Sequence, residues 1–163
     1  MDSDLGKGTT FDIYLPASSR ETRIHGETGD ALPCGKGRLL VMDDDELVRD
    51  VVAAMLQRLG YDVETAPDGA AVIERYAESR EAGNPFDLVI MDLTVPGGLG
   101  GVETARKLRE MDPKARVIES SGYSTDPVMS DYRDYGFNNV IQKPYTLQTL
   151  GKVLQAVLHE NGQ

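Results

Sequence analysis

The stretch that decides the fold is Asp87-Leu88-Val89-Ile90-Met91-Asp92-Leu93-Thr94-Val95-Pro96-Gly97-Gly98. Its four consecutive apolar residues, Leu88 to Met91, predict a strand that is buried on both faces of a parallel sheet. The strand leads directly into the carboxylate of Asp92 and then into a turn with Pro96 and several glycines. Open α/β sheets bind their ligands at the carboxyl ends of their strands. Asp92 therefore has two interpretations at this point, a turn-capping side chain or a reactive group.

Predicted strands and helices alternate along the chain on both sides of this strand. Strands are predicted at 39–42, 62–66, 88–91, 116–120 and 139–142. A helix is predicted after each strand, with starts near Asp45, Asp68, Val102, Asp126 and Thr146. Because the crossovers are short, the strands are predicted to be parallel and the connections right-handed. A barrel would need eight such units, whereas five fit a doubly wound α/β sheet of flavodoxin-like strand order 2-1-3-4-5, with helices on both faces.

The composition limits the classes of function. The 163 residues carry a formal net charge of −10 and show no basic patch, so direct binding of nucleic acid is not expected. Cys34 is the only cysteine, which excludes an intrachain disulfide. The longest apolar runs are too short to span a membrane, and the first residues do not resemble a signal peptide. We therefore expect a cytoplasmic location and no membrane contact by this chain.

The first 36 residues differ in composition from the rest. Residues 6–10 predict a flexible turn, and the alternating residues 11–15 predict a half-buried strand that ends at Pro16. Residues 17–36 mix Ser, Thr, Gly, Pro and both signs of charge, which is typical of a linker. The regular domain is expected at 37–160, with a short tail at 161–163.

Residues 1–16 resemble the end of the ATP-binding domain of sensor histidine kinases. There a G-x-G-T-x-F glycine box leads into a final strand that ends in Leu-Pro; the matching residues are Gly6, Gly8, Thr9, Phe11, Leu15 and Pro16. The resemblance implies a remnant of such a domain. A single glycine turn cannot supply a nucleotide pocket, and the Gly-Lys pair lacks the spacing of a P-loop, so no nucleotide binding is expected here.

Three carboxylates are predicted to meet where the first and third strands end. Asp43 and Asp44 follow the first strand, and Asp92 follows the third, its neighbour in the expected order. Two like unit charges about 4 Å apart repel by roughly 4 kcal/mol at an effective dielectric constant of about 20. A hard divalent cation relieves this repulsion, and Mg²⁺ prefers carboxylate oxygens and retained waters. The alternative is a solvated helix start, a role that suits Asp45 and Glu46 better.

Two further polar side chains follow the fourth and fifth strands. Ser121 precedes Gly122, and Lys143 precedes Pro144. A phosphoryl group on Asp92 has three oxygens that need partners, and Mg²⁺, the Ser121 hydroxyl and the Lys143 ammonium would supply one each. Taken singly, each would be an ordinary strand-end side chain. Their occurrence together at separate strand ends favours phosphoryl transfer.

Residues 37 to about 160 resemble the receiver domain of two-component response regulators. The matching features are the acidic pair Asp43-Asp44, Asp92 followed by Pro96, Ser121 before Gly122, and Lys143-Pro144. The resemblance implies Mg²⁺-dependent transfer of a phosphoryl group to Asp92, followed by hydrolysis. The donor would be the phosphohistidine of a histidine kinase or of a histidine phosphotransfer domain.

The resemblance also implies roles for individual residues. Asp44 and Asp92 would bind the metal directly, Asp43 would bind it through water, and the Thr94 backbone carbonyl would complete the protein ligands. The peptide bond from Lys143 to Pro144 would be cis.

Together the two resemblances imply the receiver of a hybrid sensor histidine kinase. This fragment would only accept and hydrolyse phosphate, whereas the parent chain would be the protein-histidine kinase. The sequence does not fix the oligomeric state, and a weak homodimer is compatible with it.

Two positions depart from the usual receiver pattern. The glycine-rich loop at 96–101 is one residue longer than usual, and Val140 stands where the family has a switch aromatic. Two other functions stay open. A degenerate receiver that acts as a non-phosphorylated interaction module would lack an acidic residue or the lysine, and all are present. A haloacid dehalogenase-like phosphatase would need a second aspartate where this chain has Thr94.

Overall fold

The chain divides into two compact units, Met1–Ala31 and Leu32–Gln163. The computed structural model describes residues 2–4, 8–10, 32–93, 95, 98–122 and 131–159. The predicted strand at 11–15 lies outside these residues.

The first unit contains two short paired strands. Strands β1 (Asp2–Asp4) and β2 (Gly8–Thr10) are antiparallel, with Asp2 opposite Thr10. The prediction of a turn over residues 6–10 is therefore wrong for residues 8–10. Residues 8–10 lack an apolar alternation, so the pairing that makes them a strand is not visible in the sequence pattern.

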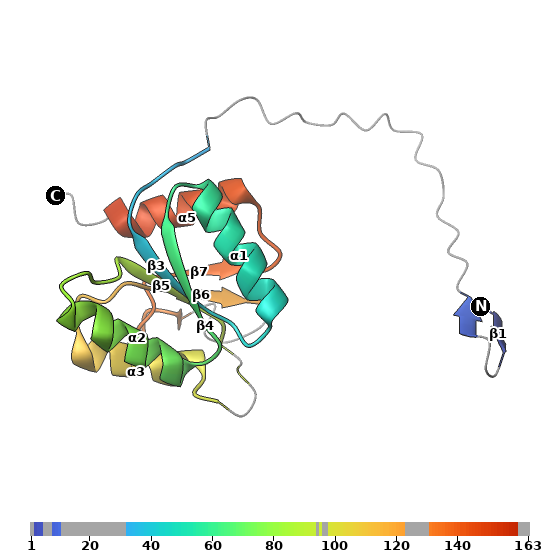
Figure 1. The fold of residues 1–163 in the computed structure, drawn as a ribbon, viewed down its shortest axis with the longest axis horizontal. Helices are drawn as coiled ribbons and strands as arrows, with labels where there is room; N and C mark the ends of the chain where they lie inside the picture. Colours follow the sequence, from blue (N-terminus) through green and yellow to red (C-terminus); the bar gives the residue numbers. More distant parts are fainter. Residues whose placement is uncertain are drawn as a thin grey trace. The chain divides into compact units, whose positions relative to one another are not determined.

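The second unit is built on a sheet of five strands, which are β3 (Arg38–Met42), β4 (Asp62–Ala66), β5 (Leu88–Met91), β6 (Val117–Ser121) and β7 (Asn139–Gln142). Their order across the sheet is β4-β3-β5-β6-β7, and every neighbouring pair is parallel. This is the predicted order 2-1-3-4-5, so the flavodoxin-like fold class is confirmed (Figure 1). All four residues of β5 are buried, which accounts for the continuous apolar run at the centre of the sequence.

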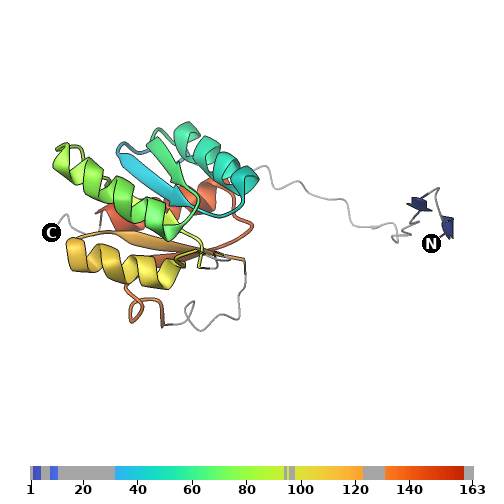
Figure 2. The same ribbon diagram turned by 60° about the horizontal axis from the view of Figure 1, so that its bottom comes forward.

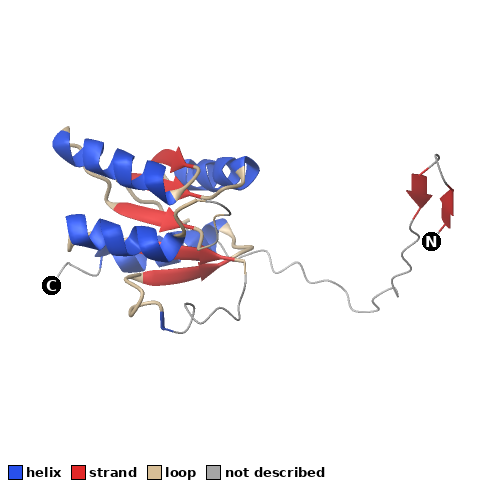
Figure 3. Cartoon of the chain, turned by 90° about the horizontal axis from the view of Figure 1, so that it is seen from below, coloured by secondary structure: helices blue, strands red, loops and turns tan. Residues whose placement is uncertain are grey.

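Helices cover both faces of this sheet, and they are α1 (Glu46–Arg58), α2 (Gly69–Glu81), α3 (Gly101–Met111) and α5 (Leu147–His159). One apolar core joins α2 and α3 to the sheet and includes Tyr76 and Leu108. A second core joins α1 and α5 to the other face and includes Leu56 and Leu154. Figures 2 and 3 show these two helical layers with the sheet between them. The start predicted for a further helix, at Asp126, lies outside the described residues.

Aspartates begin the first two helices of this unit, as predicted. Asp45 accepts a hydrogen bond from the Leu47 amide and Asp68 accepts one from the Ala71 amide, each at 2.9 Å. Each bond satisfies an amide that has no partner inside its own helix, so the side chains fix where α1 and α2 begin. Helix α1 therefore starts directly beside the acidic residues that follow β3.

The unit begins before its first strand. Residues 32–37, which we call the N-terminal strap, pack on the domain at the end of the sheet where the strands begin. Leu32 contacts the core shared with α1 and α5, and the Gly35 amide donates to the Leu59 carbonyl at 2.9 Å. Residues 32–36, predicted as the end of a linker, are thus packed against the domain. None of the helices described here has the length and apolar character needed to cross a bilayer.

Candidate phosphoacceptor site

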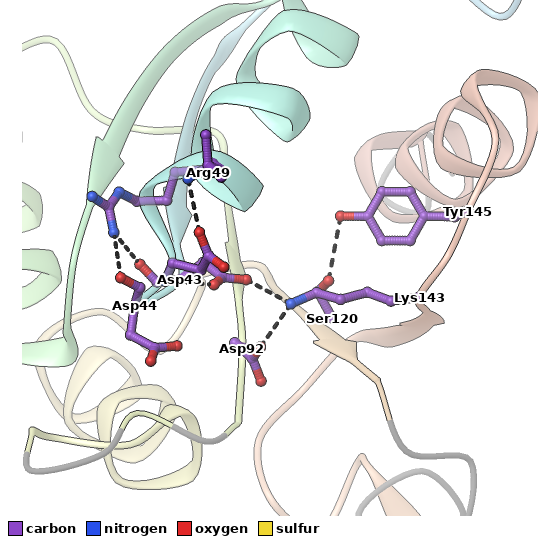
Figure 4. A network of polar contacts seen from close by, with 9 residues as sticks. Asp43, Asp44, Arg49, Asp92, Ser120, Lys143 and Tyr145 are labelled. Atoms are coloured by element: carbon purple, nitrogen blue, oxygen red, sulfur yellow. Dashed lines mark hydrogen bonds and ion pairs between the residues drawn. The ribbon is translucent and has the colours of Figure 1, made fainter. Parts of the chain in front are cut away.

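Charged side chains from three strand ends meet at the carboxyl edge of the sheet (Figure 4). Asp43 follows β3, Asp92 follows β5 and Lys143 follows β7. The Lys143 ammonium donates to Asp43 Oδ2 at 2.5 Å and to Asp92 Oδ2 at 2.6 Å. Lys143 is 100 residues from Asp43 and 51 residues from Asp92 in the sequence, so the sheet topology brings the three together.

These contacts keep Lys143 charged. Partial burial alone would lower the pKa of the ammonium, but hydrogen bonds to Asp43 and Asp92, and the negative charges of both, outweigh it. The net result is a pKa raised above the ordinary value of 10.5. At neutral pH the site therefore holds an ammonium between two carboxyl groups.

The two residues of the acidic pair have different surroundings. Asp43 is buried, with 4% of its surface exposed, and its Oδ1 accepts a hydrogen bond from the Asp45 amide at 3.0 Å. Asp44 is exposed, and its carboxylate makes no hydrogen bond or ion pair within the described residues. Asp43 is thus held through both of its oxygens, while the Asp44 carboxylate is available to a ligand.

Ser121 is the last residue of β6 and is buried, with 3% of its surface exposed. Its carbonyl accepts a hydrogen bond from the Lys143 amide at 2.7 Å, which ties the ends of β6 and β7 together. The peptide bond between Lys143 and Pro144 is cis, so that prediction is confirmed. The sheet therefore brings the ends of β3, β5, β6 and β7, with their predicted residues, to one edge.

Three of the four predicted metal ligands, Asp43, Asp44 and Asp92, lie among the described residues. Thr94, the predicted backbone ligand, lies outside the described residues. Among the residues that are described, no three acidic, histidine or cysteine side chains are grouped to hold a metal as they stand. The chemistry of the donors nevertheless suits a hard cation, because the exposed Asp44 supplies a carboxylate without a protein partner among the described residues and Mg²⁺ prefers carboxylate oxygens. The residues therefore fit a Mg²⁺ ion.

Two contacts near the site are absent from the sequence-based predictions. The Arg49 guanidinium donates from Nη1 to the carbonyls of Asp43 at 2.6 Å and Asp44 at 3.0 Å. The Ser120 hydroxyl lies 3.3 Å from the Tyr145 hydroxyl. The first contact has a sequence signal, because Arg49 lies about one helical turn after the N-cap of α1, where a long side chain can reach back to the strand end. The contact between Ser120 and Tyr145 has no such signal, because it depends on which face of β6 Ser120 and Ser121 each occupy.

Comparison with known proteins identifies the family. The sequence profile of the response regulator receiver domain matches residues 39–155, a range that contains Asp43, Asp92, Ser121 and Lys143. This chain belongs to the response regulator receiver domain family. The matched range runs from the second residue of β3 into α5 and so includes nearly all of the five-stranded sheet and its helices.

Three of the curated relatives are considerably longer than this chain. The sensor kinase CckA of Brucella abortus is 28% identical over 171 residues, covering 98% of this chain and 17% of that protein. The uncharacterized transcriptional regulatory protein YkoG of Bacillus subtilis is 30% identical over 127 residues, covering 78% and 53%. The CAI-1 autoinducer sensor kinase/phosphatase CqsS of Vibrio cholerae is 34% identical over 110 residues, covering 66% and 15%. This chain thus spans between 15% and 53% of these three proteins.

Solved structures share the receiver fold. A receiver domain protein from Clostridium thermocellum superposes with a TM-score of 0.69 at 23% identity, covering 77% of this chain and 97% of that one. The chemotaxis protein CheY4 of Vibrio cholerae gives 0.67 at 27% identity, covering 76% and 100%. TrrA of Thermotoga maritima, solved in complex with Mg²⁺ and BeF, gives 0.64 at 27% identity, covering 75% and 99%.

Proposed function

We propose that the receiver domain accepts a phosphoryl group from a phosphohistidine on Asp92, with Mg²⁺, and then hydrolyses the aspartyl phosphate. The observation that carries the proposal is the Lys143 ammonium, 2.6 Å from Asp92 Oδ2 at the end of the central strand. A fixed cation in this place stabilises the negative charge of a transferring phosphoryl group.

The chain's own residues divide the work of the transfer. A bond forms between an Asp92 carboxylate oxygen and phosphorus as the bond from phosphorus to the imidazole nitrogen breaks, and the imidazole keeps that electron pair. The Lys143 ammonium and the Ser121 hydroxyl each hold one phosphoryl oxygen in this proposal. Hydrolysis follows when water attacks phosphorus and the Asp92 carboxylate leaves.

Asp44 and Asp92 would hold Mg²⁺ directly, Asp43 through water and Thr94 through its carbonyl. When bound, the ion neutralises charge on the phosphoryl oxygens. Support comes from the exposed and unengaged carboxylate of Asp44 and from TrrA, which was solved with Mg²⁺ and BeF. Because Asp43 is held through both oxygens, it suits an indirect role better than Asp44 does.

A protein donor is supported by the surface beside the site. Leu47 and Val51 on α1 are 75% and 60% exposed, although both are large apolar residues. They line a hollow of about 320 Å³ with Met55, Pro144 and Tyr145. Exposed apolar surface of this kind is typical of a protein-binding site, and here it lies next to Lys143.

We further propose that the chain is the receiver end of a hybrid sensor histidine kinase in the cytoplasm, with residues 1–16 a remnant of the ATP-binding domain and residues 17–31 a linker. The match to the sensor kinase CckA covers 98% of this chain, so it extends well beyond residues 39–155. The protein kinase activity of the parent chain belongs to this proposal.

The test is transfer from a histidine phosphotransfer domain that carries radiolabelled phosphohistidine. The wild type and the control Asp134→Asn, an exposed aspartate in the loop before β7, should take up label in the presence of Mg²⁺. Asp92→Asn should take up none, and EDTA should prevent labelling of every variant. Labelling of Asp92→Asn at the wild-type rate would overturn the proposal.

A further inference from the structure

The Arg49 side chain contacts the backbone of the acidic pair. It lies in the first turns of α1 and is half-buried, and its backbone amide donates to the Asp45 carbonyl at 3.0 Å. Its side chain reaches back to the end of β3, where Nη1 donates to the Asp43 and Asp44 carbonyls at 2.6 and 3.0 Å (Figure 4). Within the described residues, this guanidinium thus donates to backbone carbonyls and not to the neighbouring carboxylates.

The backbone at this point needs such support. The ladder between β3 and β4 ends with the bond from the Asp43 amide to the Ala66 carbonyl, at 3.3 Å. Beyond it the Asp43 side chain is fixed by Lys143 and by the Asp45 amide. The Asp44 side chain has no such partner within the described residues, so its place depends on how its backbone is held.

We propose that Arg49 is a positioning residue for the acidic pair, holding the backbone of Asp43 and Asp44 so that the Asp44 carboxylate faces an incoming Mg²⁺ ion. The inference rests on the proposed function. By fixing two carbonyls with one rigid guanidinium, Arg49 reduces the reordering that cation binding requires.

The charge of Arg49 has an effect of opposite sign, which makes the proposal testable. A guanidinium beside the acidic pair repels a divalent cation, so its removal on charge grounds alone would tighten Mg²⁺ binding. Loss of positioning weakens binding, and loss of an outer-shell partner of a metal ligand typically costs about 10- to 100-fold in metal affinity. The direction of the change therefore separates the two roles.

The experiment is calorimetric titration of the full chain with Mg²⁺. In Arg49→Met the Mg²⁺ dissociation constant should rise about tenfold. In Arg49→Lys, which keeps the charge but replaces the rigid guanidinium with an ammonium on a shorter, flexible side chain, it should rise less. The control Arg58→Met removes an exposed arginine from the last turn of the same helix and should bind Mg²⁺ as the wild type does. An unchanged or lower dissociation constant in Arg49→Met would overturn the proposal.

Phosphorylation by acetyl phosphate supplies a second readout. The rate in Arg49→Met at saturating Mg²⁺ should approach that of the wild type, while the Mg²⁺ concentration for half the maximal rate should rise. If Arg49→Met does not fold, the test rests on Arg49→Lys. A Mg²⁺ dissociation constant of Arg49→Lys equal to that of the wild type would then refute the positioning role. If the wild type itself neither binds Mg²⁺ nor becomes phosphorylated, the proposed function fails instead.

Discussion

The two ends of the sheet are built in different ways. At the carboxyl end, Asp43, Asp92 and Lys143 are joined by charge and short hydrogen bonds. At the amino end, the N-terminal strap is joined to the domain through apolar contact and close backbone approach. Both ends connect segments that are far apart in the sequence. At the carboxyl end the required residue types are set by charge and hydrogen bonding. At the amino end they are set by the space available for side chains.

The amino end depends on the absence of side chains. A Cβ atom at Gly151 in α5 would lie 2.3 Å from Cγ of Pro33 in the strap. A Cβ atom at Gly60, where φ is +96°, would lie 2.6 Å from the Gly35 carbonyl oxygen. The backbone conformation at Gly60 also favours glycine. The strap can pack this closely only because Gly60 and Gly151 have no side chains.

The largest effect is expected at the charged end. Replacement of Lys143 by Ala removes the cation that would hold a phosphoryl oxygen, so phosphorylation by acetyl phosphate should slow by about 10²-fold. Mg²⁺ binding should persist, because an ammonium that competes for Asp43 and Asp92 is gone. Rates measured by mass spectrometry, with exposed Lys152→Ala as the control, test this; a wild-type rate in Lys143→Ala would contradict it.

An intermediate effect is expected at the strap. Gly151→Ala should destabilise the full chain by about 1–3 kcal/mol, because the new methyl group meets Pro33. In a Pro33→Gly background the same change should cost less than about 1 kcal/mol, since Cγ is gone and alanine favours a helix. Urea unfolding of the four chains gives the coupling energy. Equal costs in both backgrounds would show that the strap does not pack on α5 in solution.

The smallest effect concerns pH. Because the pKa of folded Lys143 is raised above 10.5, its ion pairs contribute stability that is fully present below pH 10.5 and is lost as the pH rises through the folded pKa. The difference in unfolding free energy between the wild type and Lys143→Met should stay constant from pH 7 to about 10 and shrink above that. Chemical denaturation at each pH measures it, with Lys152→Met as the control. A difference that falls between pH 7 and 9 would argue against these ion pairs.

The two ends were not equally predictable. The strand order and the residues at the carboxyl edge follow from the sequence, because apolar runs mark the strands and four of the five strands are followed by a polar residue suited to phosphoryl transfer. Residues 32–36 carry the composition of a linker, including Pro33 and Gly35. Their packing depends on Gly151, more than a hundred residues away, and a local pattern cannot show such a contact.

The contact of Arg49 was missed for a similar reason. Its position on α1 is predictable, but the choice between carboxylates and carbonyls as its partners depends on how the chain leaves β3. Thr94 and the start of the helix predicted from Asp126 lie outside the described residues, so both stay predictions. The charged group of Asp43, Asp92 and Lys143 is thus the part of the site that residue type alone predicts best.

The most direct test of the central claim is the intact mass of the chain after incubation with acetyl phosphate and Mg²⁺, with Asp92→Asn and Asp134→Asn measured in parallel. The wild type and Asp134→Asn should gain one phosphoryl group, with the modification on the peptide that contains Asp92, and the gain should disappear in EDTA. Asp92→Asn should keep its unmodified mass. A phosphoryl group on Asp92→Asn, or on a peptide that lacks Asp92 in the wild type, would contradict the account.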